Sequence, residues 1–454
     1  MGADTCTIVG AGPVGTLLAI LLARRGYGVR LLERRGDPRT TPPDGGRSIN
    51  LALAARGLNA LQRAGLAPRL AGVSVIMPGR MLHDEAGHTR FSPYGQREHE
   101  VLHAISRAEL SRLLVIAAAE HPGIELFFDC RCLDVDPARQ RLQLRDGRTG
   151  AERSEPFQVL LGADGAGSAV RTALAKRGLL QPMDEPLPHD YKEFHIAAGA
   201  QGPVFEPHAL HIWPRGDFML IALPNADGSF TATLFLPRQG PVSFESLGTG
   251  PVGPWFSRVF PDAAAVMPDL ERQYELHPQS HLGTLCCQPW HVGNALLVGD
   301  AAHAIVPFHG QGLNCGFEDC VVLDELLAGT PPTAAALVQQ FALFQARRQP
   351  DTDAIAALAL ENYREMRDTV RSPDFARRKT LALRLEQLFP RRFIPQYAMV
   401  TFHPEIPYAV ARARGAQQER VLDALLRRPA SADAALDATS AQALLDEAGL
   451  ESIP

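Results

Sequence analysis

The chain lacks the long apolar runs and paired cysteines that mark membrane, secreted and zinc-binding proteins. No stretch reaches the roughly 18 apolar residues that a membrane-spanning helix needs, and residues 1–7 are too short and polar for a secretory signal. The seven cysteines form no C-x-x-C pair and no metal-ligand spacing. We therefore expect reduced thiols, no metal site, no membrane anchor and a cytoplasmic location.

Basic and acidic residues are interspersed along the whole sequence. The 45 basic residues stand against 50 acidic ones, the net charge is −5, and no tail gathers the basic residues. We therefore expect no nucleic-acid partner. With 454 residues, 46% of them hydrophobic, the chain is long enough for one large core or two fused cores.

A dinucleotide-binding fingerprint is present near the N-terminus. An apolar strand precedes Gly10-Ala-Gly12-Pro-Val-Gly15, a helical segment follows, and a second strand ends at Glu33. Gly10 permits the tight turn, Gly12 lets a pyrophosphate approach the backbone, and Gly15 lets helix and strand pack closely. Glu33 can accept hydrogen bonds from ribose hydroxyls. The pattern predicts a Rossmann-like domain but does not by itself choose between FAD and NAD.

A second ligand-binding pattern lies far downstream. Residues 295–298 predict a buried strand, Gly299-Asp300 a turn, residues 307–312 a loop, and Leu313 the start of a helix. The Asp300 carboxylate can accept from ribityl or ribose hydroxyls, and a helix N-terminus offers free N–H groups. Both ends of an extended FAD would then have a site, which favours FAD over NAD.

The remaining chain divides into a strand-rich part and a helical part. Residues 189–285 show short alternating or wholly apolar runs, which predict mostly strands. Residues 51–66 and 334–428 have helical periodicity, and Pro350 is expected to end one helix before the next begins. Residues 429–454 are rich in Ala, Ser and Asp, and predict a weak helix or a disordered tail.

The Asp300 stretch resembles the single-component aromatic-hydroxylase flavoproteins, the family typified by p-hydroxybenzoate hydroxylase. The longer string Pro307-Phe308-His309-Gly310-Gln311-Gly312-Leu313-Asn314 is more similar to the kynurenine 3-monooxygenases, as are residues 46–53, 210–215, 219–225, 361–367 and 393–402. The resemblance covers about residues 5–410. It implies an α/β fold, α+β overall, with a Rossmann-like FAD-binding domain, an antiparallel β-sheet substrate domain and C-terminal helices.

The resemblance also implies that the domains interleave along the chain. FAD-binding segments are expected at residues 1–75, 101–185 and 285–345, and substrate-domain segments at 76–100 and 186–284. A helical region is expected at 346–428 and a tail at 429–454.

The residues expected to contact FAD come from several separate stretches. They are Gly10, Gly12, Pro13, Val14, Gly15, Glu33, Arg34, Arg47, Arg107, Asp164, Asp300, Gly312, Leu313 and Asn314. Three of these also allow plain structural interpretations: a solvated arginine at 47, a first-turn arginine at 107 and a turn-forming aspartate at 164.

The residues expected to contact the substrate form a polar group and an apolar group. By resemblance, the amino-acid end is held by Arg80, Tyr94, Asn362 and Tyr397, and the ring by Leu210, Leu223, Phe235, Pro307 and Phe308. An Arg fork pairs two carboxylate oxygens at once, which a Lys cannot do. Phe308 and His309 are candidates near the reacting ring, although a structural role for His309 stays open. No residue is assigned with certainty as catalytic.

The implied reaction is FAD-dependent hydroxylation of L-kynurenine to 3-hydroxy-L-kynurenine with NADPH and O2, through a flavin hydroperoxide. Because the aniline nitrogen of kynurenine activates the ring, no dedicated base is required. No second G-x-G-x-x-G module follows, so NADPH is expected as a transient co-substrate. The family's eukaryotic members carry a membrane-anchoring C-terminus, and this sequence shows no such apolar segment, so a soluble, bacterial-type form is expected.

Other interpretations stay open from the sequence. One is a hydroxylase of another anthraniloyl or phenolic acid. A flavin halogenase is disfavoured because the W-x-W-x-I-P motif is absent. A flavin-binding scaffold without turnover is disfavoured by the intact Gly12, Asp300 and Arg80. The oligomeric state is open between monomer and dimer.

Overall fold

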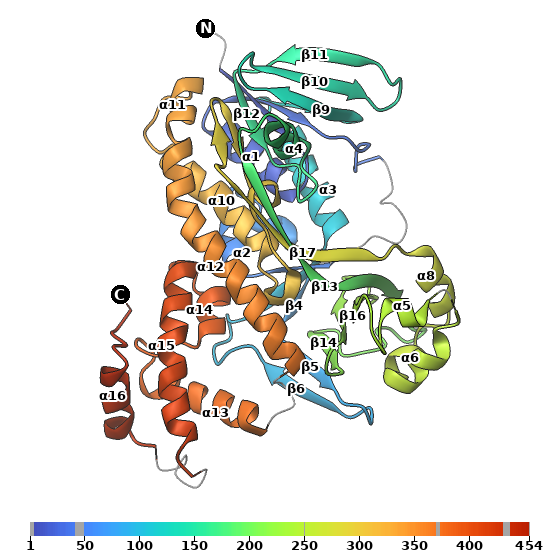
Figure 1. Cartoon of the computed structure of the whole chain (residues 1–454), viewed down its shortest axis with the longest axis vertical. Helices are drawn as coiled ribbons and strands as arrows, with labels where there is room; N and C mark the ends of the chain where they lie inside the picture. Colours follow the sequence, from blue (N-terminus) through green and yellow to red (C-terminus); the bar gives the residue numbers. More distant parts are fainter. Residues whose placement is uncertain (1–3, 41–49, 249, 369–372, 430–435, 454) are drawn as a thin grey trace.

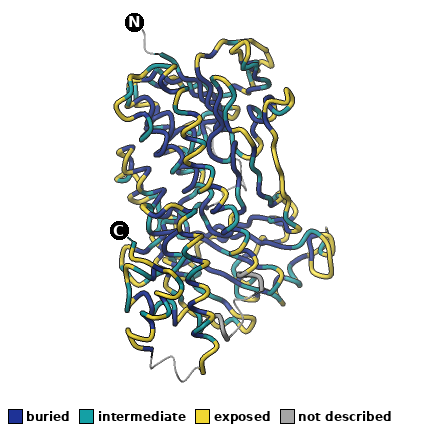
Figure 2. The backbone as a smooth tube through the Cα atoms, turned by 60° about the vertical axis from the view of Figure 1, so that its left-hand side comes forward, coloured by how far each residue is buried: buried dark blue, intermediate teal, exposed yellow. Residues whose placement is uncertain are grey.

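A computed structural model of the chain describes residues 4–40, 50–248, 250–368, 373–429 and 436–453. In Figure 1 a parallel sheet and its helices form the upper part, a mixed sheet forms the lower right part, and the last helices lie at the lower left. Figure 2 shows the backbone buried through the middle of the molecule and exposed mainly at turns and outer helices.

The predicted Rossmann-like sheet is present. Its parallel strands follow the order β19 (Ala295–Leu297), β12 (Val159–Gly162), β1 (Thr5–Val9), β2 (Gly28–Leu32) and β8 (Ile124–Phe127), with the short β18 (His291–Val292) antiparallel at one edge. The central strands are almost wholly buried, because α1 (Pro13–Arg24), α3 (Arg107–Ala119) and α10 (Gly312–Leu326) pack around them. Strands covered in this way have continuous apolar runs rather than alternation.

Two small sheets flank this core. β9 (Cys130–Asp136), β10 (Arg141–Asp146) and β11 (Glu152–Pro156) form one, and β3 (Asn50–Leu53), β7 (Leu102–Ser106) and β4 (Ser74–Met77) form the other. The helix expected over residues 51–66 is therefore wrong at its start. Residues 50–53 pair with β7 as a strand, and the helix that follows is α2 (Ala55–Arg63), succeeded by the short 3-10 helix η1 (Ala67–Leu70).

The largest sheet has seven strands. Its order is β17 (Ser280–Gln288), β13 (Gln181–Ile196), β16 (Phe230–Pro237), β15 (Met219–Pro224), β14 (Ala209–Pro214), β5 (Gly79–His83) and β6 (Thr89–Pro93). All neighbours are antiparallel except β14 and β5. Residues 244–276, expected as mostly strands, instead form α5 (Phe244–Leu247), α6 (Gly253–Val259), α7 (Pro261–Ala265) and α8 (Leu270–Leu276). These helices share a buried apolar cluster with one face of the sheet, which their apolar residues cover.

The C-terminal helices confirm the predicted helical character but correct one boundary. They are α11 (Ala334–Gln339), α12 (Phe341–Asp368), α13 (Pro373–Leu388), α14 (Gln396–Phe402), α15 (Tyr408–Leu426) and α16 (Ala438–Glu447). Pro350 does not end a helix, because α12 continues through it. Packing of α12 against α10, α15 and the 3-10 helix η2 (Pro307–His309) outweighs the cost of about 3 kcal/mol for an internal proline.

None of the described helices combines the length and the apolar character needed to cross a membrane.

Candidate active site

The turn between β1 and α1 is open at its middle glycine. Gly10 has φ +104°, and a Cβ there would lie 2.5 Å from the carbonyl oxygen of Ala163. A Cβ at Gly15 would lie 2.0 Å from the carbonyl oxygen of Gly10, so packing alone requires both outer glycines. A Cβ at Gly12 would meet nothing within 4 Å. The N-terminus of α1, capped by Gly12, therefore faces open space of the kind that a pyrophosphate occupies.

Glu33 follows the end of β2 and contacts the glycine turn through its side chain. Its carboxylate accepts hydrogen bonds from the main-chain N–H groups of Ala11 (2.9 Å) and Arg35 (3.0 Å). Each oxygen retains acceptor capacity, so the group can still accept from ribose hydroxyls. Arg34 beside it is exposed, and Pro13 lies in the first turn of α1.

Val14 joins this turn to the second predicted flavin motif. A Cβ at Gly299 would lie 3.2 Å from Cγ1 of Val14, and a Cβ at Gly316 in α10 would lie 2.7 Å from Cγ2. Gly299 has φ +62° and leads into α9 (Asp300–His303). Asp300 is half-buried and makes no hydrogen bond to another described residue. The two motifs thus lie side by side with an uncommitted carboxylate at their junction, which fits an extended FAD.

The side chain of Asn314 holds the loop between α9 and α10. Its Oδ1 accepts from the N–H of Ala54 (2.8 Å), and its Nδ2 donates to the carbonyls of Ala52 and Gly310 (2.9 Å each). This buried amide is therefore committed to joining the loop to β3 and α2. A flavin contact from residues 312–314 stays a prediction. At residue 314 the main chain, and not the occupied side-chain amide, would make this contact.

Three other predicted cofactor residues lie in different settings. Asp164 caps α4 (Ala169–Lys176), accepting from the hydroxyl of Ser168 (2.5 Å) and the N–H of Ala169 (2.7 Å), and burial raises its pKa. Arg107 is exposed at the first residue of α3. Arg47 lies outside the described residues. The flavin contacts of Asp164 and Arg107 stay predictions.

One face of the seven-stranded sheet carries the predicted apolar residues. Arg80 is in register with Leu210, and Met219 is in register with Phe235. Because successive side chains point to opposite faces of a strand, these pairs identify the other residues on the same face. The residues that share this face are Arg80, Leu210, Met219, Ile221, Leu223 and Phe235. Met219 and Ile221 were not predicted as members of this face. Their spacing of two residues along the strand, which continues to Leu223, would have indicated it.

Arg80 places its guanidinium beside two tyrosine rings. The guanidinium carbon lies 5.3 Å from the ring centre of Tyr94 and 4.8 Å from that of Tyr397, and the two rings stack with centres 6.0 Å apart. The Nε of Arg80 and the hydroxyl of Tyr94 are buried with no hydrogen-bond partner among the described residues. None of the described carboxylates forms an ion pair with Arg80. Arg80 is half-buried, and a half-buried cation without a carboxylate partner is complementary to an anionic ligand group.

His309 lies on the other side of Tyr397, at the end of η2. The two rings are stacked, with centres 5.3 Å apart and planes 16° apart. Burial, with a smaller contribution from the charge of Arg80, lowers the pKa of His309 to about 4. Its Nδ1 is buried without a hydrogen-bond partner among the described residues. The neutral imidazole can therefore make one more hydrogen bond, to a ligand.

Acid is expected to destabilise the protein through His309. Its pKa falls from 6.5 in the unfolded chain to about 4 in the folded chain, so between these values the unfolded state binds more protons. The free energy of unfolding should then decrease as pH falls, by up to about 1.4 kcal/mol per pH unit. His309→Phe should remove this contribution. Urea unfolding with saturating FAD at pH 7, 6 and 5 checks this, and an unchanged pH dependence in the variant would contradict it.

Phe308 extends the aromatic wall toward α12. Its ring centre lies 5.1 Å from that of Phe235 and 4.5 Å from that of Tyr363. Nδ2 of Asn362 donates to the carbonyl of Phe308 (2.6 Å), so this predicted substrate residue holds the loop in place. Tyr363 was not predicted as a site residue. Its position next to Asn362 is the feature of the sequence that could have indicated it. Pro307 is exposed, unlike Phe308.

A buried ion-pair network, which was not predicted from the sequence, holds the turn that precedes Asp300. Oδ2 of Asp319 accepts from the N–H of Gly299 (3.0 Å) and from Nε2 of His303 (2.7 Å), and Oδ1 accepts from Nε of Arg348 (2.8 Å). Burial alone would raise the pKa of Asp319, but the two cationic side chains hold it below its usual value. Isolated polar residues in apolar helices gave no sequence pattern from which to infer this network.

The same cluster contains a metal-like grouping. Possible ligand atoms of His303, Cys315 and Asp319 lie within 4.8 Å of one another. Arg348 contacts two of the three, with Nη2 3.4 Å from Sγ of Cys315 and Nε 2.8 Å from Asp319. A metal cation would have to displace a positive charge already in place, so the ion-pair network accounts for this cluster.

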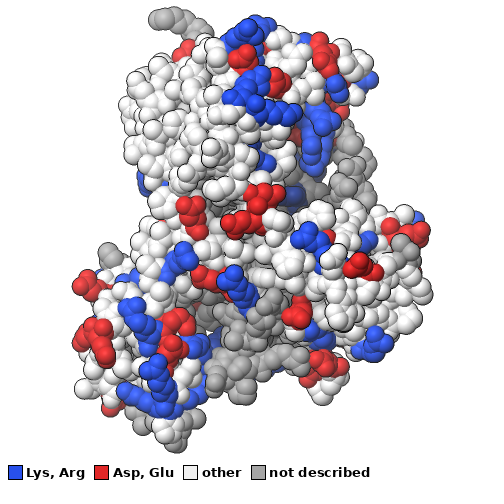
Figure 3. Space-filling view, viewed as in Figure 1, with Lys and Arg blue, Asp and Glu red and all other residues white. Residues whose placement is uncertain are grey.

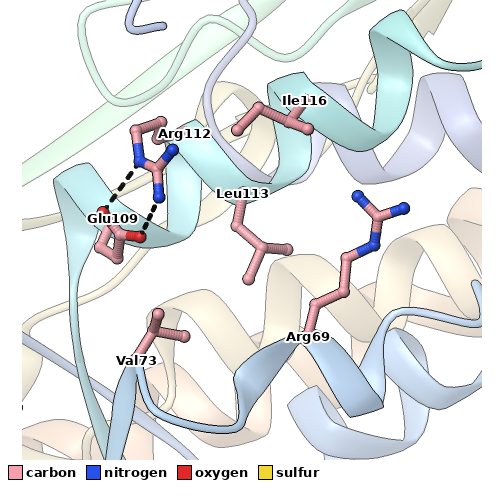
Figure 4. A pocket seen from close by; sticks show the side chains of 6 residues that line it. All are labelled: Arg69, Val73, Glu109, Arg112, Leu113 and Ile116. Atoms are coloured by element: carbon pink, nitrogen blue, oxygen red, sulfur yellow. Dashed lines mark hydrogen bonds and ion pairs between the residues drawn. The ribbon is translucent and has the colours of Figure 1, made fainter.

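Two surface cavities in the described part of the chain are lined by none of these residues. One of about 160 Å³ lies between η1 and α3 and is lined by Arg69, Val73, Glu109, Arg112, Leu113 and Ile116 (Figure 4). There Arg112 is already paired with Glu109 at 2.6 Å. Lys and Arg are interspersed with Asp and Glu on the face drawn in Figure 3. The buried groups described above, and not this cavity, are therefore the candidate site.

Comparison with known proteins first defines the class. A family model described as FAD binding domain matches residues 3–184 and 263–336. A 2-methyl-3-hydroxypyridine-5-carboxylic acid oxygenase has a similar structure, with a TM-score of 0.66 at 19% identity over 82% of this chain and 95% of that one. The p-nitrophenol 4-monooxygenase of Pseudomonas putida DLL-E4 gives 0.66 at 18% identity over 92% and 98%. The predicted α/β fold and FAD cofactor are confirmed, and the protein is a FAD-dependent monooxygenase.

Sequence relatives then define the family. The kynurenine 3-monooxygenase of Myxococcus xanthus (strain DK1622) is 47% identical over 93% of this chain and 90% of its own length. That of Xanthomonas axonopodis pv. citri (strain 306) is 46% identical over 92% and 91%. The chain belongs to the kynurenine 3-monooxygenase family, as its motifs predicted.

Proposed function

We propose that the protein hydroxylates L-kynurenine to 3-hydroxy-L-kynurenine with NADPH and O2 as co-substrates. The observation that carries the proposal is the buried Nε of Arg80, which lacks a partner among the described residues and lies in an aromatic setting beside the Phe308–His309 loop. Bound FAD would supply hydride acceptance from NADPH and activation of O2. The relatives named above carry the substrate in their name.

The protein's own residues would bind, orient and enclose the substrate. Arg80 would pair with the carboxylate, and the hydroxyl of Tyr94 would gain a partner it lacks among the described residues. Phe235 and Phe308 would pack against the ring and exclude water. Because the aniline nitrogen of the substrate activates the ring carbon beside it, neutral His309 would donate or accept a hydrogen bond rather than act as a base.

A hydroxylase of another anthraniloyl or phenolic acid is the second candidate. The amide of Asn362 donates to the carbonyl of Phe308, which weakens the case for a complete amino-acid binding set. Arg80 with Tyr94 and Tyr397 would also bind a simple aromatic carboxylate.

The proposal is tested by following NADPH oxidation by the purified, flavin-loaded enzyme with and without L-kynurenine, and by quantifying 3-hydroxykynurenine by chromatography. We expect stimulated oxidation with product formed in proportion. Stimulated oxidation that yields only hydrogen peroxide would favour the second candidate, and no stimulation would reject the proposal.

The loop that carries Tyr94 is clamped to the C-terminal helix α13 by the buried carboxylate of Glu386, and its own fold is held by the buried carboxylate of Glu100. Glu100 accepts from the N–H groups of Gln96 (2.7 Å) and Arg97 (3.0 Å). Glu386 of α13 accepts from Nη1 of Arg97 (3.0 Å) and from Nε2 of Gln96 (2.7 Å). Because Tyr397 lies in α14, the C-terminal helices both supply one tyrosine of the site and hold the loop of the other.

Releasing this clamp is expected to weaken substrate binding. Glu386→Ala leaves the guanidinium of Arg97 with one of its two carboxylates, and the Tyr94 loop loses two of its hydrogen bonds to α13. We expect KM for L-kynurenine to rise roughly tenfold, because small displacements of a positioning group are costly, with FAD affinity unchanged. Steady-state kinetics and FAD titration of the apoprotein measure both quantities.

The matched control is Glu419→Ala. Glu419 pairs with Arg378, also of α13, but its side chain is 58% exposed, and exposed pairs contribute little. An equal rise in KM in both variants would show a general effect on the C-terminal helices and contradict the clamp.

A further inference from the structure

A chain of buried hydrogen bonds runs across the other face of the Arg80 sheet. Nδ1 of His83 lies 2.6 Å from Oδ2 of Asp262, and Nε2 of His83 lies 2.8 Å from Nδ1 of His211. Nε2 of His211 lies 2.9 Å from the carbonyl oxygen of Glu206. Nε1 of Trp213 donates to both oxygens of Asp262, at 2.9 and 3.0 Å. His83 and His211 are only 2% and 1% exposed, so water does not complete these bonds.

The donors and acceptors along this chain determine where its protons lie. The carbonyl of Glu206 can only accept, so Nε2 of His211 carries a proton. Burial lowers the pKa of His211 to about 4, so this ring is neutral and its Nδ1 is a lone pair. Nε2 of His83 must therefore donate to it. Asp262 accepts from Trp213 at both oxygens, which favours its ionised form, so Nδ1 of His83 must donate as well.

We propose that His83 is an imidazolium held between Asp262 and His211, and that this bridge positions the β5 strand so that Arg80 can bind the substrate carboxylate. The second half of this proposal rests on the proposed function; the first half does not. His83 ends β5, three residues after Arg80 on the opposite face. Asp262 belongs to α7 and His211 to β14, so the bridge joins three elements at this end of the strand.

The charges around His83 are consistent with one bound proton. Asp262 is the carboxylate in direct contact, and the neighbouring Asp84 lies just past the end of β5. Nη1 of Arg215 donates to the main-chain carbonyl of His83 (3.1 Å), so this second cation holds the strand rather than the ring. The exposed Glu206 contributes its main-chain carbonyl to the chain.

Without the extra proton the chain would contain a repulsive contact. A neutral His83 that donates to Asp262 would face His211 with a lone pair, and two bare nitrogens would then lie 2.8 Å apart. Removing the negative charge of Asp262 should release the extra proton, because a neutral His83 can donate from Nε2 to His211 and accept at Nδ1 from the asparagine amide. The bond between β5 and α7 would then lose its ionic character, and the end of β5 that follows Arg80 would be held less firmly.

The protonation state is tested directly by nitrogen NMR of the FAD-loaded enzyme with 15N-labelled histidine at pH 7.5. The signals of His83 are identified by their absence in His83→Gln. We expect both ring nitrogens of His83 to carry protons, and one of them to lose its proton in Asp262→Asn. An unprotonated ring nitrogen on His83 in the parent protein would overturn the proposal.

The positioning role is tested by steady-state kinetics of Asp262→Asn. We expect KM for L-kynurenine to rise about tenfold, kcat to change less than about twofold, and FAD affinity to stay unchanged. The control is Leu234→Val, because Leu234 lies on the same buried face, in register but one strand further from Trp213 than Leu220. An unchanged KM in Asp262→Asn, or an equal rise in Leu234→Val, would overturn the positioning role.

Failure of the proposed function gives a different result. If L-kynurenine does not stimulate NADPH oxidation in the parent enzyme, the substrate assignment fails and the positioning role fails with it. The imidazolium assignment is then decided by the NMR spectrum of the parent protein alone.

Discussion

Replacing Arg80 with alanine is expected to weaken L-kynurenine binding by roughly 2–5 kcal/mol, the usual scale for breaking a buried charge pair. The guanidinium has its Nε buried without a hydrogen-bond partner among the described residues and is flanked by the rings of Tyr94 and Tyr397, so alanine would remove the charge from this aromatic setting. FAD affinity should stay the same, because Arg80 lies in β5 of the seven-stranded sheet and not in the sheet that carries the glycine turn. Titration of the oxidised enzyme with L-kynurenine, followed by the flavin spectrum, measures the change.

Arg80→Lys is the matched control. It keeps the charge but loses the planar fork, so we expect an intermediate loss of affinity. Unchanged affinity in the alanine variant would remove Arg80 from the carboxylate site. Equal losses in both variants would mean that geometry, not charge, determines binding.

Replacing Gly12 with valine is expected to abolish tight FAD binding while the apoprotein stays folded. The φ of −68° at Gly12 suits any residue, and a Cβ there meets nothing within 4 Å, so the free energy of unfolding of the apoprotein should change by less than about 0.5 kcal/mol. The added side chain would occupy the space predicted for the pyrophosphate. We expect FAD affinity to fall by about 100-fold or more, the scale of losing close phosphate contacts.

Gly15→Ala provides the contrast. Its Cβ would lie 2.0 Å from the carbonyl oxygen of Gly10, so the apoprotein itself should be destabilised. Urea unfolding of both apoproteins and fluorescence titration with FAD separate the two effects. If Gly12→Val unfolds the apoprotein as Gly15→Ala does, the opening at Gly12 is not a ligand site.

The parts of the fold that could be predicted are those specified by short-range constraints. The glycine turn before α1 and the strand before Asp300 follow from local backbone and burial patterns, and both occur as expected. The helix through Pro350 and the strand at residues 50–53 could not be predicted, because packing and pairing with distant residues outweigh local preference there. The helices at residues 244–276 were missed because each is too short, at four to seven residues, to show a helical period.

Within the site, residue identities were easier to predict than the direction of each side chain. Arg80, Tyr94 and Tyr397 come together as expected, although they belong to separate elements. Asn314 and Asn362 use their amides to hold the loop of residues 307–314, because a buried amide bonds to whatever main chain is nearest. Spacing along the sequence carries no information about that choice.

The unbroken α12 acts as a spacer of fixed length between two parts of the enzyme. Arg348, near its start, binds Asp319 beneath the Asp300 turn, and Asn362, further along, holds the Phe308 loop. These two positions are separated by close to four helical turns, or about 21 Å, so they point in similar directions. Inserting one residue between them would rotate one contact by about 100° relative to the other. One continuous helix therefore sets the distance between the network beneath the Asp300 turn and the Phe308 loop.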